Sequence, residues 1–520
     1  MPPRDAGDQI VVEAPPDRPR PREPFGGSSA RRLRWPHPPT APILIAILAS
    51  VALAGLSAAL LPTVPSYDPW AWIVWGREVF DPHLSFAVGG GPSWKPLPVI
   101  FTAVFGLFGN AAPTLWVITA RAAGLLALVA AWRLAARLMG GGRAGAFAGG
   151  VAALGVLLTQ DWFYYMFRGT SEPMLVASSL WAVDRLLAGR RGQAFALAIA
   201  GSLIRPEWWP FALAYAVWLW RREPRLRALV ALGLLAIPFF WFVPPWIGSG
   251  QPLLAATHAK DYNGHLGAHP LLTVLRRGAD LQLLPALIAA LIAVAISWWR
   301  ERDRTVLALA AGALAWWVLV VAMTLDGYPG LERFYLPAAG VTCVLAGVGV
   351  ARLALLAGGS AWATSQQRLP GSGPAPASAI AVAVAALAIG VSIPFTASRI
   401  DSARSQKPAA DRAVRILDQL GAATAAVGGH AAVYPCRSSF AAVNHGVQTA
   451  LAWKLHVTLG RVGTTMRHPG LDFIGPHNVT DGAAAPISSG LTAAAQIAHV
   501  GVWRVLRVVH PGRSQRCVGS

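Results

Sequence analysis

Long apolar runs separated by short polar segments dominate the chain from residue 42 to residue 396. Each run is close to the roughly 20 residues that an α-helix needs to cross a bilayer. One of them, 194–220, is interrupted by Arg205-Pro206-Glu207, and we interpret it as two short helices. The pattern predicts an all-α polytopic membrane protein with about eleven transmembrane helices, formed by residues 42–63, 114–136, 144–163, 172–188, 194–220, 226–247, 281–299, 305–325, 335–357 and 378–396.

Three segments depart from this pattern. Residues 1–40 are rich in Pro and charged residues and have no apolar face, which predicts a disordered cytoplasmic tail before the membrane domain of residues 41–396. Residues 96–109, at the end of the first outer loop (64–98), form an apolar run too short to span, which favours a re-entrant or interfacial helix. Residues 397–520 mix short apolar stretches with Gly, His and Pro and predict a small α/β or α+β domain.

The composition agrees with a membrane protein, because 54% of the 520 residues are hydrophobic and only 13% are charged. The net charge of +20 comes mostly from arginines clustered between apolar runs, as the positive-inside rule expects. No RNA-binding motif or contiguous basic domain is present, so we expect no nucleic-acid partner. The same clusters place the N-terminus in the cytoplasm and the C-terminal domain outside it, where Cys436 and Cys517 are candidates for a disulfide.

The loop after the first span carries residues suited to chemistry at a membrane surface. Asp68, between Tyr67 and Trp70, is either the cap of the following helix or a catalytic carboxylate. Lys95, which follows Trp94, is either a lysine that reaches the head-group level or a cation that holds a lipid phosphate. The tryptophans are candidates for stacking on sugar rings or for anchoring the loop in the membrane.

Six further ionisable residues fall on the predicted outer side, at helix starts, in the break of the run 194–220, or within a span. Ionisable side chains at membrane depth are costly, so they usually form ion pairs or line a cavity. Both interpretations stay open, and a capped helix start with Glu172 in its first turn is a further alternative there. We select as candidate site residues Arg121, Arg168, Glu172, Arg205, Glu207 and Arg333.

Taken in order, these motifs resemble the GT-C superfamily of membrane glycosyltransferases, above all its protein mannosyltransferase-like and aminoarabinose-transferase-like branch. The resemblance rests on an acidic residue soon after the first span, a Lys-Pro motif before the next membrane segment, and an Arg-aromatic-Leu-Pro motif before a late helix. These are Asp68, Lys95-Pro96-Leu97-Pro98 and Arg333-Phe334-Tyr335-Leu336-Pro337, and Arg121 and Glu172 match two further family positions.

One departure concerns the second acidic residue that the family usually places beside the first. This chain has Pro69 at that position, so the second carboxylate must come from elsewhere. Glu78, Asp81 and Glu172 are the candidates.

The resemblance implies transfer of a sugar, with inversion, from a polyprenyl-phosphate donor to a cell-envelope glycan, lipid or protein at the outer face of a bacterial cell membrane. A divalent metal ion is a possible cofactor, and a transporter or flippase for a lipid-linked sugar is the alternative function. The resulting hypothesis has three groups of residues: Asp68 and Glu172 as catalytic groups, Lys95, Arg168, Arg205 and Arg333 on the donor phosphate, and Tyr67, Trp70, Trp94, Arg121 and Glu207 lining the substrate.

Overall fold

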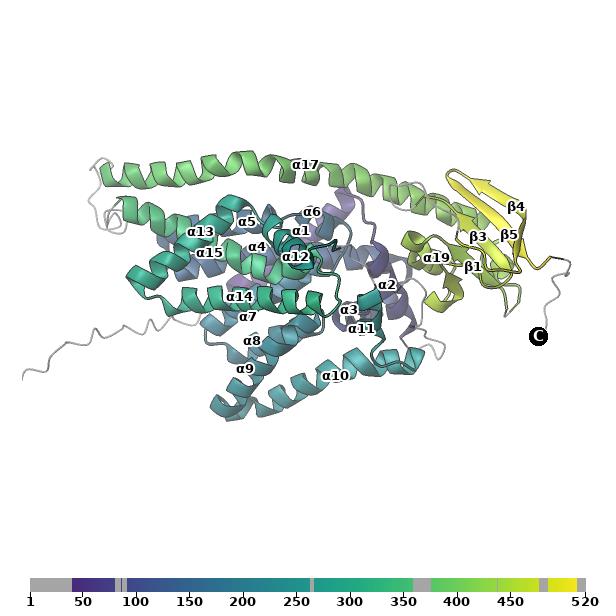
Figure 1. Ribbon diagram of the computed structural model, residues 1–520, viewed down its shortest axis with the longest axis horizontal. Coiled ribbons are helices and arrows are strands. Elements are labelled where there is room, and N and C mark those ends of the chain that lie inside the picture. Colours follow the sequence, from purple (N-terminus) through teal and green to yellow (C-terminus); the bar gives the residue numbers. More distant parts are fainter. Residues whose placement is uncertain are drawn as a thin grey trace, which may run out of the picture. The chain divides into compact units, whose positions relative to one another are not determined.

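The computed structural model describes residues 40–79, 86, 91–261, 266–358, 376–436, 438–476 and 485–511. The expected tail up to residue 39, Asp81 and Cys517 lie outside the described residues. Helices make up most of the described chain, and a small sheet follows them (Figure 1). The fold class predicted from the sequence is therefore confirmed.

The helices that precede the sheet include all the expected apolar runs. Two of them flank the predicted break at Arg205, where a 3-10 turn, η2 (Pro206–Trp208), replaces the helix. The interpretation of 194–220 as two short helices is confirmed by their bounds. The helices are α1 (Thr40–Leu60), α2 (Tyr67–Glu78), α3 (Pro96–Gly106), α4 (Ala112–Leu138), α5 (Gly142–Leu157), α6 (Trp162–Phe167), α7 (Glu172–Leu187), α8 (Arg191–Ser202), α9 (Trp209–Arg222), α10 (Arg227–Ser249), α11 (Leu254–Asp261), α12 (Pro270–Asp280), α13 (Leu284–Ile296), α14 (Arg304–Leu325), α15 (Leu336–Gly358) and α17 (Pro376–Ala426).

Seven stretches of the described chain are helical, long and apolar enough to cross a membrane: Ala41–Leu60, Gly109–Leu138, Pro224–Ser249, Leu284–Glu301, Arg304–Leu325, Glu332–Ala357 and Val382–Ala426. The protein is thus a multi-pass membrane protein. The other four expected spans form α5, α7, α8 and α9, which have 16, 16, 12 and 14 residues. Helix α3 has 11 residues, about 16 Å at the α-helical rise, and is too short to span.

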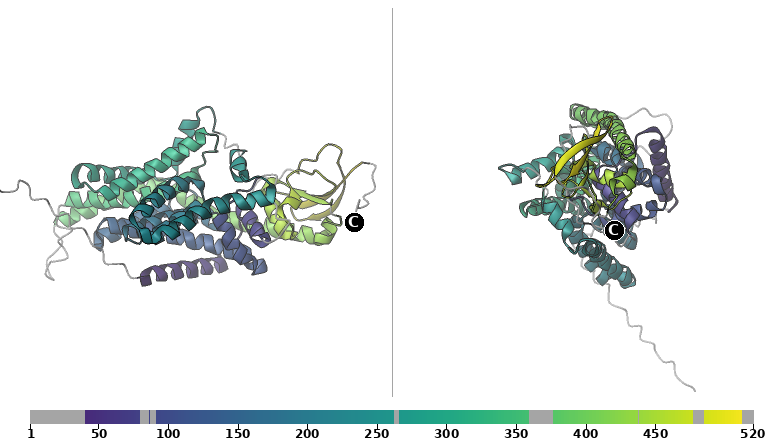
Figure 2. Two further views of the ribbon diagram at one scale, coloured as in Figure 1. Left: turned by 90° about the horizontal axis from the view of Figure 1, so that it is seen from below. Right: turned by 90° about the vertical axis from the view of Figure 1, so that its right-hand side faces the viewer.

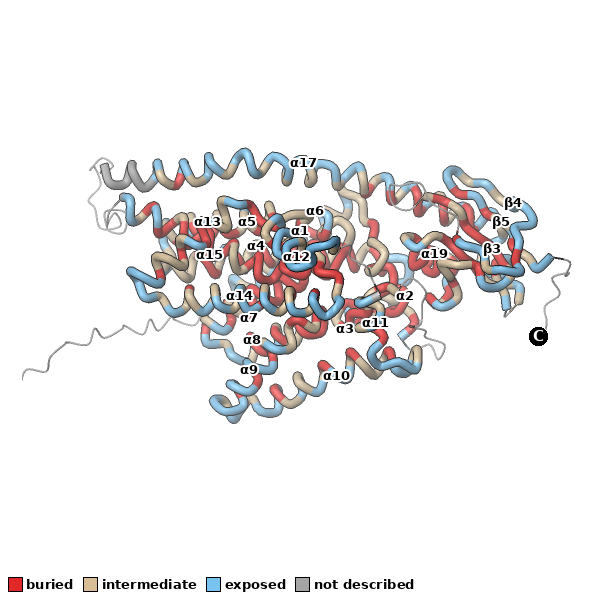
Figure 3. Tube along the Cα trace, viewed as in Figure 1, coloured by how far each residue is buried: buried red, intermediate tan, exposed pale blue. Residues whose placement is uncertain are grey.

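Buried residues gather between α4, α5, α13 and α15, whereas the apolar part of α17 is largely exposed (Figure 3). Helix α15 packs closely against two neighbours through two glycines. A Cβ at Gly347 would overlap the carbonyl oxygen of Ala148 in α5, and a Cβ at Gly349 would overlap that of Ala289 in α13. Small residues allow helix backbones in a membrane to approach this closely.

The C-terminal part contains a five-stranded mixed sheet in the order β2-β1-β3-β5-β4. Strand β1 pairs in parallel with β2 and β3, while β5 pairs antiparallel with β3 and β4. The sheet lies at one end of the helices (Figures 1 and 2). Its elements, with two short helices, are α18 (Gly429–Val433), β1 (Phe440–Val443), α19 (Gln448–Lys454), β2 (Val462–Gly463), β3 (Gly470–Ile474), β4 (Thr492–Val500) and β5 (Trp503–Val509).

Helix α17 joins the two parts of the chain without a break. The domain boundary expected at residues 396–397 falls inside this 51-residue helix. Near its end, the fully buried Trp503 of β5 donates its indole N–H to the Ile416 carbonyl at 2.8 Å. Cys436, in the segment between α18 and β1, is disulfide-bonded, and the free Cys343 is buried in α15.

The glycine contact between α15 and α13 predicts a large effect for a small substitution. Gly349→Ala adds one methyl group where the Ala289 carbonyl leaves no room, so we expect a loss of about 1–3 kcal/mol in stability. Thermal unfolding in detergent measures it. Gly312→Ala in α14 is the matched control, because nothing lies within 4 Å of the added Cβ. Equal unfolding temperatures for the two variants would contradict the close packing.

Candidate active site

Asp68 lies in the first turn of α2, but its carboxylate bonds to another segment of the chain. The backbone N–H of Ser93 donates to Oδ1 at 3.2 Å, and the Ser93 hydroxyl donates to Oδ2 at 2.8 Å. The helix begins at Tyr67, with Ser66 at the N-cap position. The interpretation of Asp68 as a helix cap is therefore wrong, and its carboxylate is instead oriented toward the segment that leads to Lys95.

Lys95 is buried, with 6% of its surface exposed, so it does not reach out to the head-group level. Its Nζ donates to the Ser171 hydroxyl at 2.7 Å and lies 3.7 Å from Glu172 Oε1. It also lies 5.2 Å from the centre of the Trp72 ring. Burial lowers the pKa of Lys95 to about 8, and the nearby Glu172 carboxylate opposes that shift.

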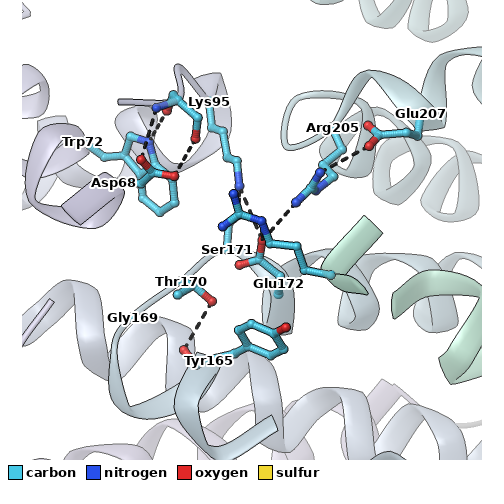
Figure 4. A network of polar contacts seen from close by, with 12 residues as sticks. Asp68, Trp72, Lys95, Tyr165, Gly169, Thr170, Ser171, Glu172, Arg205 and Glu207 are labelled. Atoms are coloured by element: carbon cyan, nitrogen blue, oxygen red, sulfur yellow. Dashed lines mark hydrogen bonds and ion pairs between the residues drawn. The ribbon is translucent and has the colours of Figure 1, made fainter. Parts of the chain in front are cut away.

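Glu172, the first residue of α7, is the centre of a cluster of cations (Figure 4). Its Oε1 atom lies 3.0 Å from Arg205 Nη2 and 3.9 Å from Arg333 Nε, in addition to the contact with Lys95. Arg333 belongs to a 3-10 turn, η5 (Glu332–Tyr335), directly before α15. We call these four residues, Lys95, Glu172, Arg205 and Arg333, the Glu172 cluster.

Lys95, Glu172 and Arg205 are nearly closed to water, whereas the Arg333 side chain is 35% exposed. Glu172 is 1% exposed and Arg205 is 6% exposed. Arg205 also pairs with Glu207 at 3.2 Å and lies 4.3 Å from the centre of the Phe334 ring. Electrostatic interactions are stronger in such a dry environment than at a surface. With Glu207 included, three cations face two carboxylates, and the remaining positive charge is suited to hold a further anion.

Four other predicted site residues lie outside the Glu172 cluster. Trp94 is 7% exposed and packs against Trp75 and Phe86, with its indole N–H bonded to the Phe240 carbonyl at 3.1 Å. Tyr67, Trp70 and Arg168 instead line a hollow near the C-terminal part.

Arg121, 3% exposed, also lies apart from the Glu172 cluster. It bonds to the Ser57 hydroxyl at 3.1 Å and to the Pro62 carbonyl, and no carboxylate of the described residues pairs with it. It therefore holds the chain between α1 and α2.

Arg168 and Glu172 are only four residues apart, yet their side chains lie in different places. Arg168 lines the hollow, whereas Glu172 contacts the three cations of its cluster. Gly169 adopts a φ of +66°, a left-handed conformation that glycine tolerates best, and it ends the run of α6. Trp116 donates its indole N–H to the Gly169 carbonyl at 2.6 Å and fixes the turn. Helical spacing, which would place i and i+4 on one face, does not apply across this turn.

Two serines of the site were missed in the sequence. Ser93 orients Asp68, and Ser171 accepts a hydrogen bond from Lys95. Each stands next to, or two residues from, a predicted site residue, and this proximity was the only signal for them. A small hydroxyl residue beside a functional residue is too common to single out from one sequence.

The C-terminal part holds the start of α2 from the other side. The Tyr67 hydroxyl donates to Gln448 Oε1 at 2.9 Å, and Thr449 donates to the Tyr67 carbonyl at 2.9 Å. At the far end of α2, Arg77 donates to the Val457 carbonyl at 2.8 Å. Helix α2 is thus fixed by Ser93 on one side and by α19 on the other.

The described residues offer few suitable ligands for a metal ion. Within the described chain, no group of three or more His, Cys, Asp or Glu side chains is placed to hold one. Glu78, a candidate for the second acid, pairs with Arg77 at 2.5 Å. Beside Glu172, the positive charge that a metal ion would bring is already supplied by three side chains, so the residues there do not fit a metal.

The comparisons with known proteins identify the fold. Two crystal structures of ArnT from Cupriavidus metallidurans, one bound to undecaprenyl phosphate and one in the apo state, match with a TM-score of 0.50. Each match covers 90% of this chain and 98% of that chain, at 14% sequence identity. No protein-family model and no curated protein sequence matches. The resemblance seen in the sequence is confirmed for the fold.

Removing the central charge of the Glu172 cluster tests its electrostatic role. Glu172→Gln leaves two buried cations, Lys95 and Arg205, and the partly exposed Arg333 without their shared partner, so we expect a loss of about 3–5 kcal/mol in stability. Thermal unfolding in detergent is the measurement. The control is Glu332→Gln, since Glu332 is 40% exposed and pairs with Arg277 at 3.3 Å. That variant should lose less than about 1 kcal/mol. A Glu172→Gln protein as stable as the control would show that the cations do not depend on Glu172.

Proposed function

We propose that the protein is a membrane glycosyltransferase that moves a sugar from a polyprenyl-phosphate-linked donor to an acceptor, with inversion at the anomeric carbon. The observation that carries the proposal is the convergence of Lys95, Arg205 and Arg333 on one buried point. Such a concentration of positive charge suits a phosphate leaving group. The fold shared with ArnT, of which one structure holds undecaprenyl phosphate, supports the same class of donor.

In this proposal the three cations bind the donor phosphate. Their charge stabilises the negative charge that grows on the phosphate as the bond to the sugar breaks. Arg205 and Arg333 bring planar guanidinium groups, which match two phosphate oxygens at once. Arg168 is not assigned to the donor phosphate, because no ion pair joins it to the Glu172 cluster.

Glu172 positions the cations before the donor arrives. Like charges repel when buried together, and a central carboxylate offsets that repulsion. Because three cations stabilise its charged form, Glu172 is a poor proton acceptor. We therefore assign it to positioning and not to proton transfer.

Asp68 is the proposed general base. The acceptor hydroxyl attacks the anomeric carbon from the side opposite the phosphate and gives its proton to the Asp68 carboxylate. The new carbon–oxygen bond forms while the sugar–phosphate bond breaks, and the polyprenyl phosphate leaves with the bonding electrons. Ser93 holds the carboxylate in place through its two hydrogen bonds. The arginine clusters between the spans support an outer-face location of the site. In this proposal the membrane is that of a bacterial cell, and the acceptor is a cell-envelope glycan, lipid or protein.

Replacing the proposed base tests this assignment. Asp68→Asn keeps an oxygen for Ser93 but removes the proton acceptor, so we expect turnover to fall by about 10²–10⁴-fold. Purified protein in detergent is incubated with undecaprenyl-phosphate-linked sugars and a cell-envelope fraction, and released undecaprenyl phosphate is measured. Asp326→Asn, at a residue that is 69% exposed, is the control and should keep wild-type turnover. Full turnover by Asp68→Asn would exclude Asp68 as the base, and a wild type that forms no product in detergent would favour the transporter.

The charge on Lys95 gives the donor site a characteristic pH dependence. With a pKa of about 8, Lys95 is charged below that pH and becomes neutral as the pH rises through it. We therefore expect undecaprenyl phosphate affinity to fall above pH 8 by up to about tenfold per pH unit. Calorimetric titration between pH 7 and pH 10 measures it. Lys95→Arg stays charged over this range, so its affinity should stay level; a parallel fall in both proteins would exclude Lys95 as the titrating group.

A further inference from the structure

A second group of arginines lies at the far end of α7 from Glu172. Asp184, in the last turn of that helix, is fully buried, and two arginines donate to its two oxygens. Arg137 of α4 donates to Oδ1 through Nε at 3.2 Å and Nη2 at 3.0 Å, and Arg185 donates to Oδ2 through Nε at 3.0 Å. At the α-helical rise, the twelve residues from Glu172 to Asp184 span about 18 Å, so this group is separate from the Glu172 cluster.

Arg133 of α4 is a third cation beside Asp184, and it makes no hydrogen bond within the described chain. Its Nε atom lies 3.7 Å from Asp184 Oδ2, an ion-pair distance, and is buried without an acceptor. The terminal atoms Nη1 and Nη2 have no acceptor either, but the protein does not enclose them, and 18% of the side chain is exposed. The guanidinium lies 5.4 Å from the centre of the Trp181 ring, which supports it from one side. Arg133 therefore presents free donors at an accessible point.

These four residues form what we call the Asp184 cluster: Asp184, Arg133, Arg137 and Arg185. In the described chain, neither Arg133 nor Arg185 forms an ion pair with any other carboxylate. Even apart from Arg137, two positive charges share one negative charge. The hydrogen bonds of the carboxylate go to Arg137 and Arg185, so the surplus charge is the one on Arg133.

Another buried arginine of the helical part has the opposite ratio of charges. Arg352 of α15, 6% exposed, pairs with Glu301 at 3.1 Å and with Asp303 at 2.6 Å. One cation meets two carboxylates there, and no positive charge is left over. A largely buried cation without a matching anion is costly. The surplus in the Asp184 cluster is therefore not a general feature of the buried arginines in this chain, and an anion from outside would offset its cost.

The Asp184 cluster lies at the end of a membrane-length helix. Arg133 and Arg137 belong to the last two turns of the stretch Gly109–Leu138. The neighbouring Trp132 is exposed, and tryptophan is enriched where a bilayer meets water. The arginine pattern of the sequence predicts that this end faces the cytoplasm. The anions at that depth of a bilayer are the phosphates of lipid head groups.

We propose that the Asp184 cluster binds the phosphodiester of an anionic phospholipid in the cytoplasmic leaflet, with Arg133 as the principal contact. The planar guanidinium matches two phosphate oxygens at once. The single charge of a phosphodiester equals the surplus on Arg133. Basic pockets between transmembrane helices bind lipid head groups through the same interactions. The bound lipid stabilises the junction of α4 and α7, and this site is independent of the proposed sugar transfer.

Calorimetric titration of the full chain in a non-ionic detergent tests the site. Dioctanoyl phosphatidylglycerol carries the negative phosphodiester, and dioctanoyl phosphatidylcholine carries the same phosphate without a net charge. Glycerol 1-phosphate carries a phosphate without acyl chains. We expect dioctanoyl phosphatidylglycerol to bind at least about tenfold more tightly than either of the others. Glycerol 1-phosphate binding as tightly would show that the cluster takes a free phosphate and would overturn the lipid site.

Three variants assign the binding to Arg133. Arg133→Gln should weaken dioctanoyl phosphatidylglycerol by at least about tenfold. Because Arg133 makes no hydrogen bond, the unfolding temperature of this variant without lipid should stay close to that of the wild type. Arg133→Lys keeps the charge without the fork and should bind with intermediate affinity. Arg225→Gln is the matched control, since it removes one exposed arginine from the turn between α9 and α10, and it should bind as the wild type does.

The remaining outcomes would contradict the site. Equal weakening by Arg133→Gln and Arg225→Gln would show that the lipid responds only to the total charge of the surface. Dioctanoyl phosphatidylcholine binding as tightly as dioctanoyl phosphatidylglycerol would show that the charge is not recognised. Binding that survives Arg133→Gln but is displaced by undecaprenyl phosphate would assign the probe to the Glu172 cluster. Should Arg133→Gln not fold, Arg133→Lys compared with Arg225→Lys provides the same test.

Discussion

The buried carboxylate of Glu172 is the interaction on which the geometry of this protein depends. Lys95 comes from the segment before α3, Arg205 from the turn between α8 and α9, and Arg333 from the turn before α15, and all three meet at one oxygen. Without that negative charge, the three segments would bring mutually repelling cations together, two of them, Lys95 and Arg205, in the buried interior. In the proposed function, the charge that binds these segments together also assembles the phosphate site, so folding and binding would rely on the same atoms.

A second constraint acts on α2, the helix that carries Asp68. Its side chains are fixed by partners that lie far away in the sequence: Ser93 bonds to Asp68, and Gln448 and Thr449 bond to Tyr67 across more than 380 residues. The C-terminal part is therefore a structural component of the candidate site and not an appendage to a complete membrane domain. The orientation of the proposed base depends on contacts that form only when both parts of the chain are in place.

The sequence predicted much of this arrangement, because apolar length is a strong signal for membrane helices and a Pro between two ionisable residues is a strong signal for a break at Arg205. It also selected the four residues of the Glu172 cluster. The sequence did not reveal that Arg168 lies apart from the Glu172 cluster. Helical spacing does not predict the left-handed turn at Gly169, which separates Arg168 from Glu172. The helix cap expected of Asp68 was wrong for a similar reason: a distant serine, and not the local backbone, binds its carboxylate. The expected boundary at residue 397 lies inside α17, which remains helical where its side chains change from apolar to polar.

Helix α17 has a mechanical consequence. At 1.5 Å per residue, its 51 residues extend for about 75 Å, more than twice the roughly 30 Å of a hydrocarbon core. Its apolar first half is largely exposed, as a surface that faces lipid would be, and its later turns supply Ile416 and Leu417 to the wall of the hollow beside Tyr67. Pro394 and Pro408 interrupt its backbone hydrogen bonds, so a tilt of the apolar part is absorbed at these two positions before it reaches Ile416. The C-terminal part is therefore held against α2 by its own hydrogen bonds to Tyr67, independently of how the membrane-embedded half of α17 leans.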